Sequence, residues 1–550
     1  MKFNKLLILS AAIQGLLATG VTQSANAADD HSGGAAQTTP SEENLDMKAR
    51  IEARKKEVEK EIAEEEQKKN GYYKEAGTYG TKRLTQPPSY TVNLSKTGID
   101  SVRDITWLDV GLENRTRYEH RDDDIRRSNP LPDAGPAARR SYAGGVDEPV
   151  LLKTRAYLGL KEILDPFRFA VEIQDSRRYN SRFTPDNRDV NEFEFIQAYG
   201  ELYFKDALGR DDLGTNRPLS IKAGRFNFEF LDRRLIASNE WRNTTNTFQG
   251  FQVALGQDKN DWSIDGLALQ PLDRLKYNTD KPIEQQWFYG AIGHWRKWSR
   301  WITLEPYYLG LRKEDTGIAG DKDNRDIIAP ALRAYGFIPG TGFNWDMDAM
   351  YQFGRSNDRN TGQSLQQDAF GFTFEAGYTF DHPWKPRISA QYGYASGDKD
   401  PTDNKNNRFE RFFGFARPWS ADDYIIMENI SAPKLRLEFE PTKKLKIDTG
   451  VGLYWLASDQ DRFNNLFSIP DANNFNRDRT GDSGDYLGNS FDIRARYEPF
   501  AHVKTTVGYS HFTTGSFVRN RMVASNGGVP GSFADDSDFF YIEVLLNAFK

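Results

Sequence analysis

The stretch that decides the fold is FNWDMDAMYQF, from Phe343 to Phe353, in which apolar and polar residues alternate. The stretch FGFTFEAGYTF, from Phe370 to Phe380, repeats this pattern. Because residues two apart in a β-strand share a face, each stretch predicts a strand with one apolar face and one wet face. Shorter or less regular versions occupy residues 108–118, 167–173, 445–457, 491–497 and 540–546.

Patterns of this kind predict about eighteen strands. They begin near residues 104, 149, 166, 192, 217, 246, 260, 284, 300, 327, 341, 366, 386, 431, 444, 487, 503 and 537. The connections after even-numbered strands are mostly tight, with residues 206–216 as the exception, and those after odd-numbered strands are mostly long and polar. A soluble sandwich has no reason to collect its long loops at one end, whereas a transmembrane barrel has short periplasmic turns and long outer loops. The sequence therefore predicts an all-β chain, a transmembrane antiparallel up-and-down β-barrel over residues 101–550.

Composition excludes several other classes of protein. The 550 residues contain no cysteine, so a cysteine-based zinc site, an iron–sulfur cluster and a disulfide framework are excluded. Beyond residue 27 no apolar run reaches the roughly 18 residues that a transmembrane helix needs. The 73 basic and 79 acidic residues nearly cancel, which gives no indication of a nucleic-acid partner.

The N-terminus has the pattern of a secretory signal peptide over residues 1–27, with the small-x-small cleavage site Ala25-Asn26-Ala27. Residues 28–100 are a polar linker that includes a charged helix over about residues 41–69. That helix is either solvated on all sides or forms a short coiled coil, through self-association or with a periplasmic partner. The signal peptide predicts Sec-type export, and the barrel predicts insertion among the lipids of the outer membrane of a Gram-negative cell. An even number of strands then places both barrel termini in the periplasm.

Inward-facing residues decide what passes through a barrel of this size. Alternation predicts a largely basic arc on the strands at the two ends of the chain, with acidic residues interleaved, consisting of Arg115, Arg117, Lys153, Arg155, Arg168, Arg436, Arg494 and Arg496. Asp346 and Asp348 fall on the opposite arc. Two interpretations stay open: the arginines pair with carboxylates and stiffen the wall, or they form a guanidinium ladder that passes an anion along the pore.

Four segments resemble, in order, the core motif of the alginate-export outer-membrane porin family: AGR at 223–225, DRRL at 232–235, EWRN at 240–243 and TFQG at 247–250. Segments at 395–401, 492–497, 508–509 and 515–517 resemble later parts of the same domain. The resemblance implies an eighteen-stranded barrel and passive secretion of an acidic polysaccharide through an arginine-lined pore, with loops that act as gates. The motif positions carried over are Gly224, Arg225, Arg233, Arg234 and Trp241.

We therefore expect an outer-membrane porin for an anionic solute, and within that class we expect an acidic polysaccharide such as alginate. Two alternatives remain, a general or small-anion porin and an adhesion or scaffold barrel. A barrel enzyme would need a clustered catalytic group, and none is identifiable. The sequence Gly481-Asp482-Ser483-Gly484 resembles a serine-protease loop only by chance. The six histidines are dispersed, so we predict no catalytic residues, no metal site and no cofactor.

Overall fold

A computed structural model describes residues 54, 71–72, 74–77, 86–126, 128–130, 140–142, 144–230, 233–314, 324–358, 362–400, 402–414, 416, 418–463 and 476–549. The chain divides into two units, residues 1–73 and residues 74–550. The predicted signal peptide and, apart from Arg54, the predicted helix over residues 41–69 lie outside the described residues. No helix in the described part of the chain is long and apolar enough to cross a membrane.

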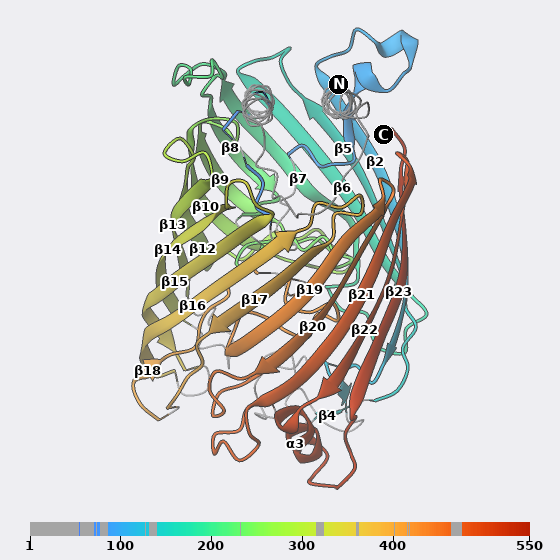
Figure 1. Ribbon diagram of the computed structural model, residues 1–550, viewed down its shortest axis with the longest axis vertical. Helices are drawn as coiled ribbons and strands as arrows, with labels where there is room; N and C mark the ends of the chain where they lie inside the picture. The colour runs from blue at the N-terminus through green and yellow to red at the C-terminus, as the bar shows by residue number, and fades with distance from the viewer. Residues whose placement is uncertain are drawn as a thin grey trace, which may run out of the picture. The chain divides into compact units, whose positions relative to one another are not determined.

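Residues 74–550 are built around one closed antiparallel barrel (Figure 1). Its eighteen strands, counted over the described residues, are β2 (Leu108–Asp122), β5 (Val150–Leu160), β6 (Phe167–Tyr179), β7 (Asn191–Phe204), β8 (Leu219–Phe226), β9 (Phe248–Leu255), β10 (Trp262–Asp273), β12 (Gln286–Trp295), β13 (Ile302–Lys313), β14 (Arg325–Phe337), β15 (Phe343–Asn357), β16 (Ser364–Thr379), β17 (Arg387–Ala395), β19 (Ile430–Thr442), β20 (Leu445–Trp455), β21 (Tyr486–Phe500), β22 (Val503–Thr514) and β23 (Asp536–Asn547). Each strand pairs with its neighbours in the chain, and β23 closes the barrel by pairing with β2. The predicted barrel and its strand number are confirmed.

Several short elements accompany the barrel. They are β1 (Thr91–Asn93), η1 (Leu94–Lys96), η2 (Asp100–Val102), β3 (Ser128–Pro130), β4 (Arg140–Tyr142), β11 (Lys281–Pro282), β18 (Lys405–Asn406) and α3 (Ser516–Ser525). β1 pairs with β2 at residues 109–111, just beyond the part of β2 that β23 covers, and it lies within the stretch predicted to be linker. Unpaired backbone groups on a strand edge are costly in an apolar environment, and β1 satisfies those at this end of β2.

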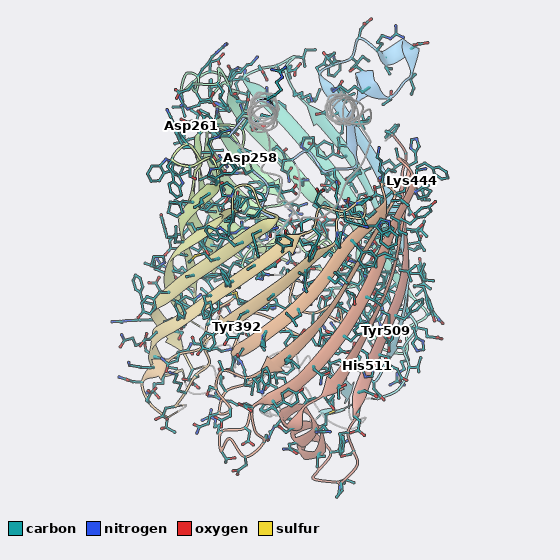
Figure 2. All side chains as sticks on the ribbon, viewed as in Figure 1. Asp258, Asp261, Tyr392, Lys444, Tyr509 and His511 are labelled. Atoms are coloured by element: carbon teal, nitrogen blue, oxygen red, sulfur yellow. The ribbon has the colours of Figure 1, made fainter. Side chains whose placement is uncertain are left out.

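The connections differ in length at the two ends of the barrel. At one end they are between two and seven residues long, except for residues 205–218, and at the other they reach 34 residues at 396–429. Asp258, Asp261 and Lys444 belong to or adjoin the short turns and lie near one end, whereas Tyr509 and His511 lie towards the other (Figure 2). In an outer-membrane barrel the short turns are periplasmic, so we name the two ends periplasmic and extracellular on this basis.

Side chains alternate between the two faces of each strand as predicted. On β15, Phe343 and Tyr351 are each 46% exposed on the outer face, while Asp346 and Asp348 are buried on the inner face. The outer face carries large apolar and aromatic side chains around the whole barrel, in keeping with contact with lipid.

The expectation of a polar inner face is wrong for part of the barrel wall. On β10, β12 and β13 the inward positions include Leu269, Phe288 and Leu309, all fully buried. A strand that is buried on both faces loses the alternation of apolar and polar residues. What buries the inner face here is a pair of extracellular loops that fold back into the barrel.

Candidate functional site

The loop between β8 and β9, residues 227–247, enters the barrel and is held by the basic side chains of β2 and β5. Arg115 donates to the carbonyl oxygens of Glu240 at 2.7 Å and Arg242 at 3.0 Å. Arg117 donates to the Trp241 carbonyl at 2.7 Å, and Lys153 to the Glu240 carbonyl at 3.2 Å. Buried carbonyl groups need donors, and long basic side chains on the wall supply them. Three of the predicted lumen residues therefore anchor a loop inside the lumen.

Asn243, the residue after Arg242, anchors the same loop to β5, to β6 and to the loop that follows β6. Its amide nitrogen donates to the carbonyl oxygens of Leu152, Arg177 and Asp189, at 3.0, 2.9 and 2.8 Å. Its own carbonyl accepts from Ser176 at 2.7 Å, and its side-chain oxygen accepts from Arg115 at 3.1 Å. Asn243 belongs to the motif segment EWRN, but it was not among the predicted site residues.

Asn243→Ala is expected to loosen this loop. The substitution removes the two N–H donors that the three carbonyls share and the oxygen that accepts from Arg115, and at about 1 kcal/mol net for each of these three groups the loop should open more easily by about 3 kcal/mol. Trypsin cleavage of the folded protein after Arg233 or Arg242 should therefore be much faster. Asn404→Ala, at an exposed asparagine of another extracellular loop, is the matched control. Equal cleavage rates in the two variants would contradict the anchoring role.

A second loop, residues 396–429, contacts the inner face of β15, β17, β19 and β20. The Trp419 carbonyl accepts from Lys434 of β19 and from Tyr454 of β20, both at 3.1 Å. Gln352 of β15 donates through Nε2 to the Glu410 carbonyl and accepts through Oε1 from Glu410 N, at 2.7 Å each. A side chain at Gly393 of β17 would clash with the Trp419 ring, so glycine makes room in the wall for the loop.

The two loops meet in the interior and share one apolar core. Ile236 and Phe413 form a parallel β-bridge, and Ala237 N donates to the Phe413 carbonyl at 3.1 Å. Aromatic rings then connect the loops to the wall, with Phe413 edge-on to both Phe248 and Phe288 at centroid distances of 5.1 and 5.3 Å. The loops therefore fill much of the extracellular half of the lumen, and the apolar core that they share with the wall includes residues of the barrel strands from β8 to β22.

A cavity of about 610 Å³ remains on the periplasmic side, along the walls formed by β2, β5 and β19–β23. Ten basic side chains line it: Arg115, Lys153, Arg155, Arg233, Lys443, Lys444, Lys446, Arg494, Arg496 and Lys504. Six carboxylates also line it: Glu113, Glu240, Glu438, Glu440, Glu498 and Glu543. The cavity is therefore mixed in charge with a basic excess.

The wall arginines were predicted either to pair with carboxylates or to present guanidinium groups to an anion, and this region contains arginines in both situations. Arg436 is buried between Asp448 at 2.5 Å and Asp492 at 3.0 Å, which is a wall pair. Arg494 and Arg496 share the carboxylate of Asp448 at 3.0 and 3.1 Å. Their side chains keep 21% and 32% exposure, and both line the cavity. These two guanidinium groups are therefore accessible to an anion in the lumen.

Glu240 is the acidic residue that the infolded loop adds to this cavity. It forms an ion pair with Arg155 at 2.7 Å. Burial alone would raise the pKa of Glu240, but the charges of Arg155 and Lys153 outweigh it and lower the pKa to about 2. Glu240 is therefore ionised at any pH at which an outer membrane functions, and it offsets part of the basic charge.

The other predicted site residues lie outside this cavity. Arg168 pairs with Asp165 at 2.8 Å and covers the Tyr203 ring near a periplasmic turn. Asp346 pairs with Arg333 at 2.5 Å, and Asp348 accepts from the Tyr307 hydroxyl at 2.7 Å. These contacts connect strands of the wall, and the one between Tyr307 and Asp348 joins β13 to β15 across the intervening β14.

The motif residues divide between backbone and loop roles. Gly224, with φ of 127°, faces Gly250 across β8 and β9, and a side chain there would clash with the Ala198 carbonyl. Arg233 adopts φ of 67° and lines the 610 Å³ cavity, whereas Arg234 is buried with its guanidinium 5.3 Å from the centroid of the Trp419 ring. Trp241 lines the cavity as well.

Arg225, the remaining motif residue, holds the loop between β10 and β12, which contains Asp280, against the wall. It pairs with the buried Glu194 and donates to the Asp280 carbonyl at 2.8 Å. Asp280 N in turn donates to Glu194 at 2.6 Å, and the Asp280 carboxylate accepts from Leu275 N at 2.8 Å and from Asn191 at 2.9 Å. Two carboxylates thus lie close together at the extracellular end of β7.

The stability of the folded barrel should depend on the ionisation of Asp280. Burial, with the nearby charge of Glu194, raises the pKa of Asp280 to about 6. Because this value lies above the unfolded pKa of about 4, the stabilisation is complete below about pH 4 and is lost as the pH rises through about 6. Asp280→Asn should therefore melt at a higher temperature than the wild type at pH 8 and at the same temperature at pH 4. A constant difference across this range would contradict the assignment.

A smaller cavity of about 60 Å³ lies beyond Trp241, towards the extracellular loops. Its lining includes Arg117, Arg188, Arg242 and Asp423, from β2 and three loops. Trp241 lines this cavity and the 610 Å³ cavity. Trp241 therefore borders both spaces, on the wall where the predicted basic arc lies.

Comparisons with known proteins agree with this architecture. The profile of the alginate export family matches residues 106–531. Among solved structures, Pseudomonas aeruginosa opdK aligns with a TM-score of 0.51 at 9% identity, over 80% of this chain and 98% of opdK. The P. aeruginosa proteins OccK8 (OprE) and OpdQ each align with a TM-score of 0.50 at 13% identity, over 80% of this chain and 98% of theirs. These structures are similar in fold alone.

No curated protein matches the chain in a sequence search. The family profile nevertheless covers most of the chain, and its region coincides with the closed barrel described above. The chain therefore belongs to the alginate export family, and it is an outer-membrane β-barrel of the porin and export-channel type.

Proposed function

We propose that this barrel gives passive passage to an acidic polysaccharide, such as alginate, from the periplasm to the cell surface. The observation that carries the proposal is the 610 Å³ cavity beside the periplasmic turns, with ten basic and six acidic side chains in its lining. A uronate chain carries one carboxylate on each ring, and the fork of an arginine matches the geometry of a carboxylate. Porin and export barrels are not generally enzymes, and the proposal involves no catalytic step.

The mixed charge of the cavity favours weak, exchangeable binding of an anionic solute, as transport requires, over tight binding at one site. A channel must bind its solute well enough to admit it and weakly enough to release it. Carboxylates such as Glu240 and Glu543 compete with the solute for guanidinium groups of the cavity lining, since Arg155 binds Glu240 and Arg115 lies 3.7 Å from Glu543. An anion that moves along this wall exchanges one partner for another, and no single site holds it tightly.

A second candidate function is the diffusion of small anions. The observation in its favour is the small volume beyond Trp241, about 60 Å³, which is far below the size of a sugar ring with its substituents. Passage of a polymer therefore requires the infolded loops to move, whereas a small carboxylate needs less movement. The two candidates share the basic cavity and differ in what the loops must do.

Conductance of the purified full-length protein in a planar lipid bilayer separates these functions. An open channel whose current is blocked by a six-residue oligouronate, and not by maltohexaose, supports passage of an acidic polysaccharide. An anion-selective current that neither oligosaccharide blocks supports the small-anion porin and overturns the main proposal. An absence of conductance favours the adhesion or scaffold barrel. The predicted pairing role of residues 41–69 is a separate proposal, tested by the oligomeric state after their deletion.

A further inference from the structure

Trp241 lines both lumenal cavities, and its ring is held in a defined orientation. The Arg117 guanidinium lies 3.8 Å from the centroid of the indole ring. Tyr541 of β23 packs edge-on against the indole at 4.8 Å, and Phe539 does so at 6.2 Å. Trp241 is partly exposed, and its position in the lining of both cavities directs this exposure into the lumen.

The surroundings of the ring combine apolar surface with cationic groups. Tyr541, Leu545 and Pro418 line the large cavity together with Trp241, in a lining that is otherwise almost entirely charged. Arg494 and Arg496 line the same cavity and keep part of their guanidinium surface accessible. A purely electrostatic path for anions has no need of an aromatic patch in this position.

A uronate ring has the complementary chemistry. One face of a pyranose presents C–H groups that pack against an aromatic ring, and the carboxylate on C5 projects from the ring edge towards any nearby cation. Aromatic side chains with a few well-placed polar groups are the usual lining of sites for such ligands. Small anions such as acetate have no ring face and gain nothing from the indole.

We propose that Trp241, supported from behind by the buried Tyr541, forms a saccharide-binding subsite inside the lumen that takes one pyranose ring of an acidic chain. The subsite rests on the proposed function and specifies which part of the lumen recognises the sugar ring in addition to its charge. The indole can serve this purpose because the loop is anchored here through the backbone of Trp241, whose carbonyl accepts the hydrogen bond from Arg117 at 2.7 Å.

The test compares Trp241→Leu, Trp241→Phe and the wild type in planar bilayers, with a six-residue oligouronate and with citrate as blockers. Loss of one aromatic contact is worth about 1.4 kcal/mol, so Trp241→Leu should weaken the oligouronate block about tenfold. Trp241→Phe keeps a ring and should weaken the block less than Trp241→Leu does. Block by citrate should change in neither variant. Trp384→Leu, at an exposed tryptophan beside a periplasmic turn, is the matched control and should leave the oligouronate block unchanged.

The outcomes distinguish the subsite from the proposed function. If oligouronate fails to block the wild type, the proposed function fails first. If it blocks the wild type and Trp241→Leu equally, the function stands and the subsite is wrong. Equal losses of oligouronate and citrate block would show that the substitution disturbs the loop, which also overturns the subsite. Tryptophan fluorescence gives an independent readout: an oligouronate-induced change should be lost in Trp241→Phe and retained in Trp384→Phe.

Discussion

Replacing residues 399–428 by a short glycine–serine linker is expected to raise the single-channel conductance severalfold. An eighteen-stranded barrel is wide enough for an aqueous channel when its interior is empty. Here the loop bearing Phe412 and Trp419 occupies that interior, and it also supports the loop of residues 227–247 through the bridge between Ile236 and Phe413. Removing the first loop should therefore loosen the second. Planar-bilayer recordings at fixed salt and voltage measure the change.

The matched control for this deletion is a shortening of residues 205–218, the longest of the periplasmic connections. This connection contacts the neighbouring periplasmic turn, for example where Asn260 donates to Asp211 at 2.7 Å. Its shortening should leave the conductance unchanged. A linker variant that folds into a heat-modifiable barrel, yet conducts as the wild type does, would show that the loop does not restrict the lumen.

Arg494→Glu combined with Arg496→Glu is expected to shift the reversal potential in a salt gradient towards cations. The double reversal changes the lining of the large cavity from ten basic and six acidic side chains to eight of each. At about 0.01 M salt the screening length is about 30 Å, so the ions in the cavity respond to the altered charge of its lining. We expect the ratio of anion to cation permeability to fall by roughly threefold.

Lys205→Glu with Arg210→Glu applies the same change of charge at the periplasmic connection outside the cavity lining. This control should leave the selectivity almost unchanged. If the reversal potential of Arg494→Glu with Arg496→Glu also stays unchanged, the two arginines act only as wall pairs of Asp448 and do not contact permeating ions.

Much of the fold could be predicted because lipid and water impose period-two alternation on each strand. The predicted strand starts differ from the observed ones by at most four residues, the largest difference being at β2, predicted near 104 and found at Leu108. On β13 the alternation is weaker, because Leu309 and Leu311 face the infolded loops while Tyr308 faces outwards. The run Tyr307-Tyr308-Leu309 was the available signal that this strand has apolar surroundings on both faces, the infolded loops inside and lipid outside.

The arrangement of the lumen was harder to predict. Alternation gives the face on which Arg115 lies, but not its partners, which are 125 to 128 residues away in a long polar loop. The apolar residues Phe228, Phe230, Leu235 and Ile236 indicate that part of loop 227–247 is buried, but they do not indicate that it is buried inside the barrel. The inward glycine at 393, opposite Trp419, is a trace of this packing, yet glycines within strands also mark bulges and tight bends.

The shared apolar core of the two infolded loops has a consequence for how the passage opens. Phe412, Phe413 and Ile236 pack with wall residues such as Phe288, so neither loop can leave its place without exposing the other to water. Segments that depend on one another in this way open together as a cooperative unit. The interior then behaves as a small folded domain housed within the barrel, and its opening should appear as discrete current steps with a single melting transition.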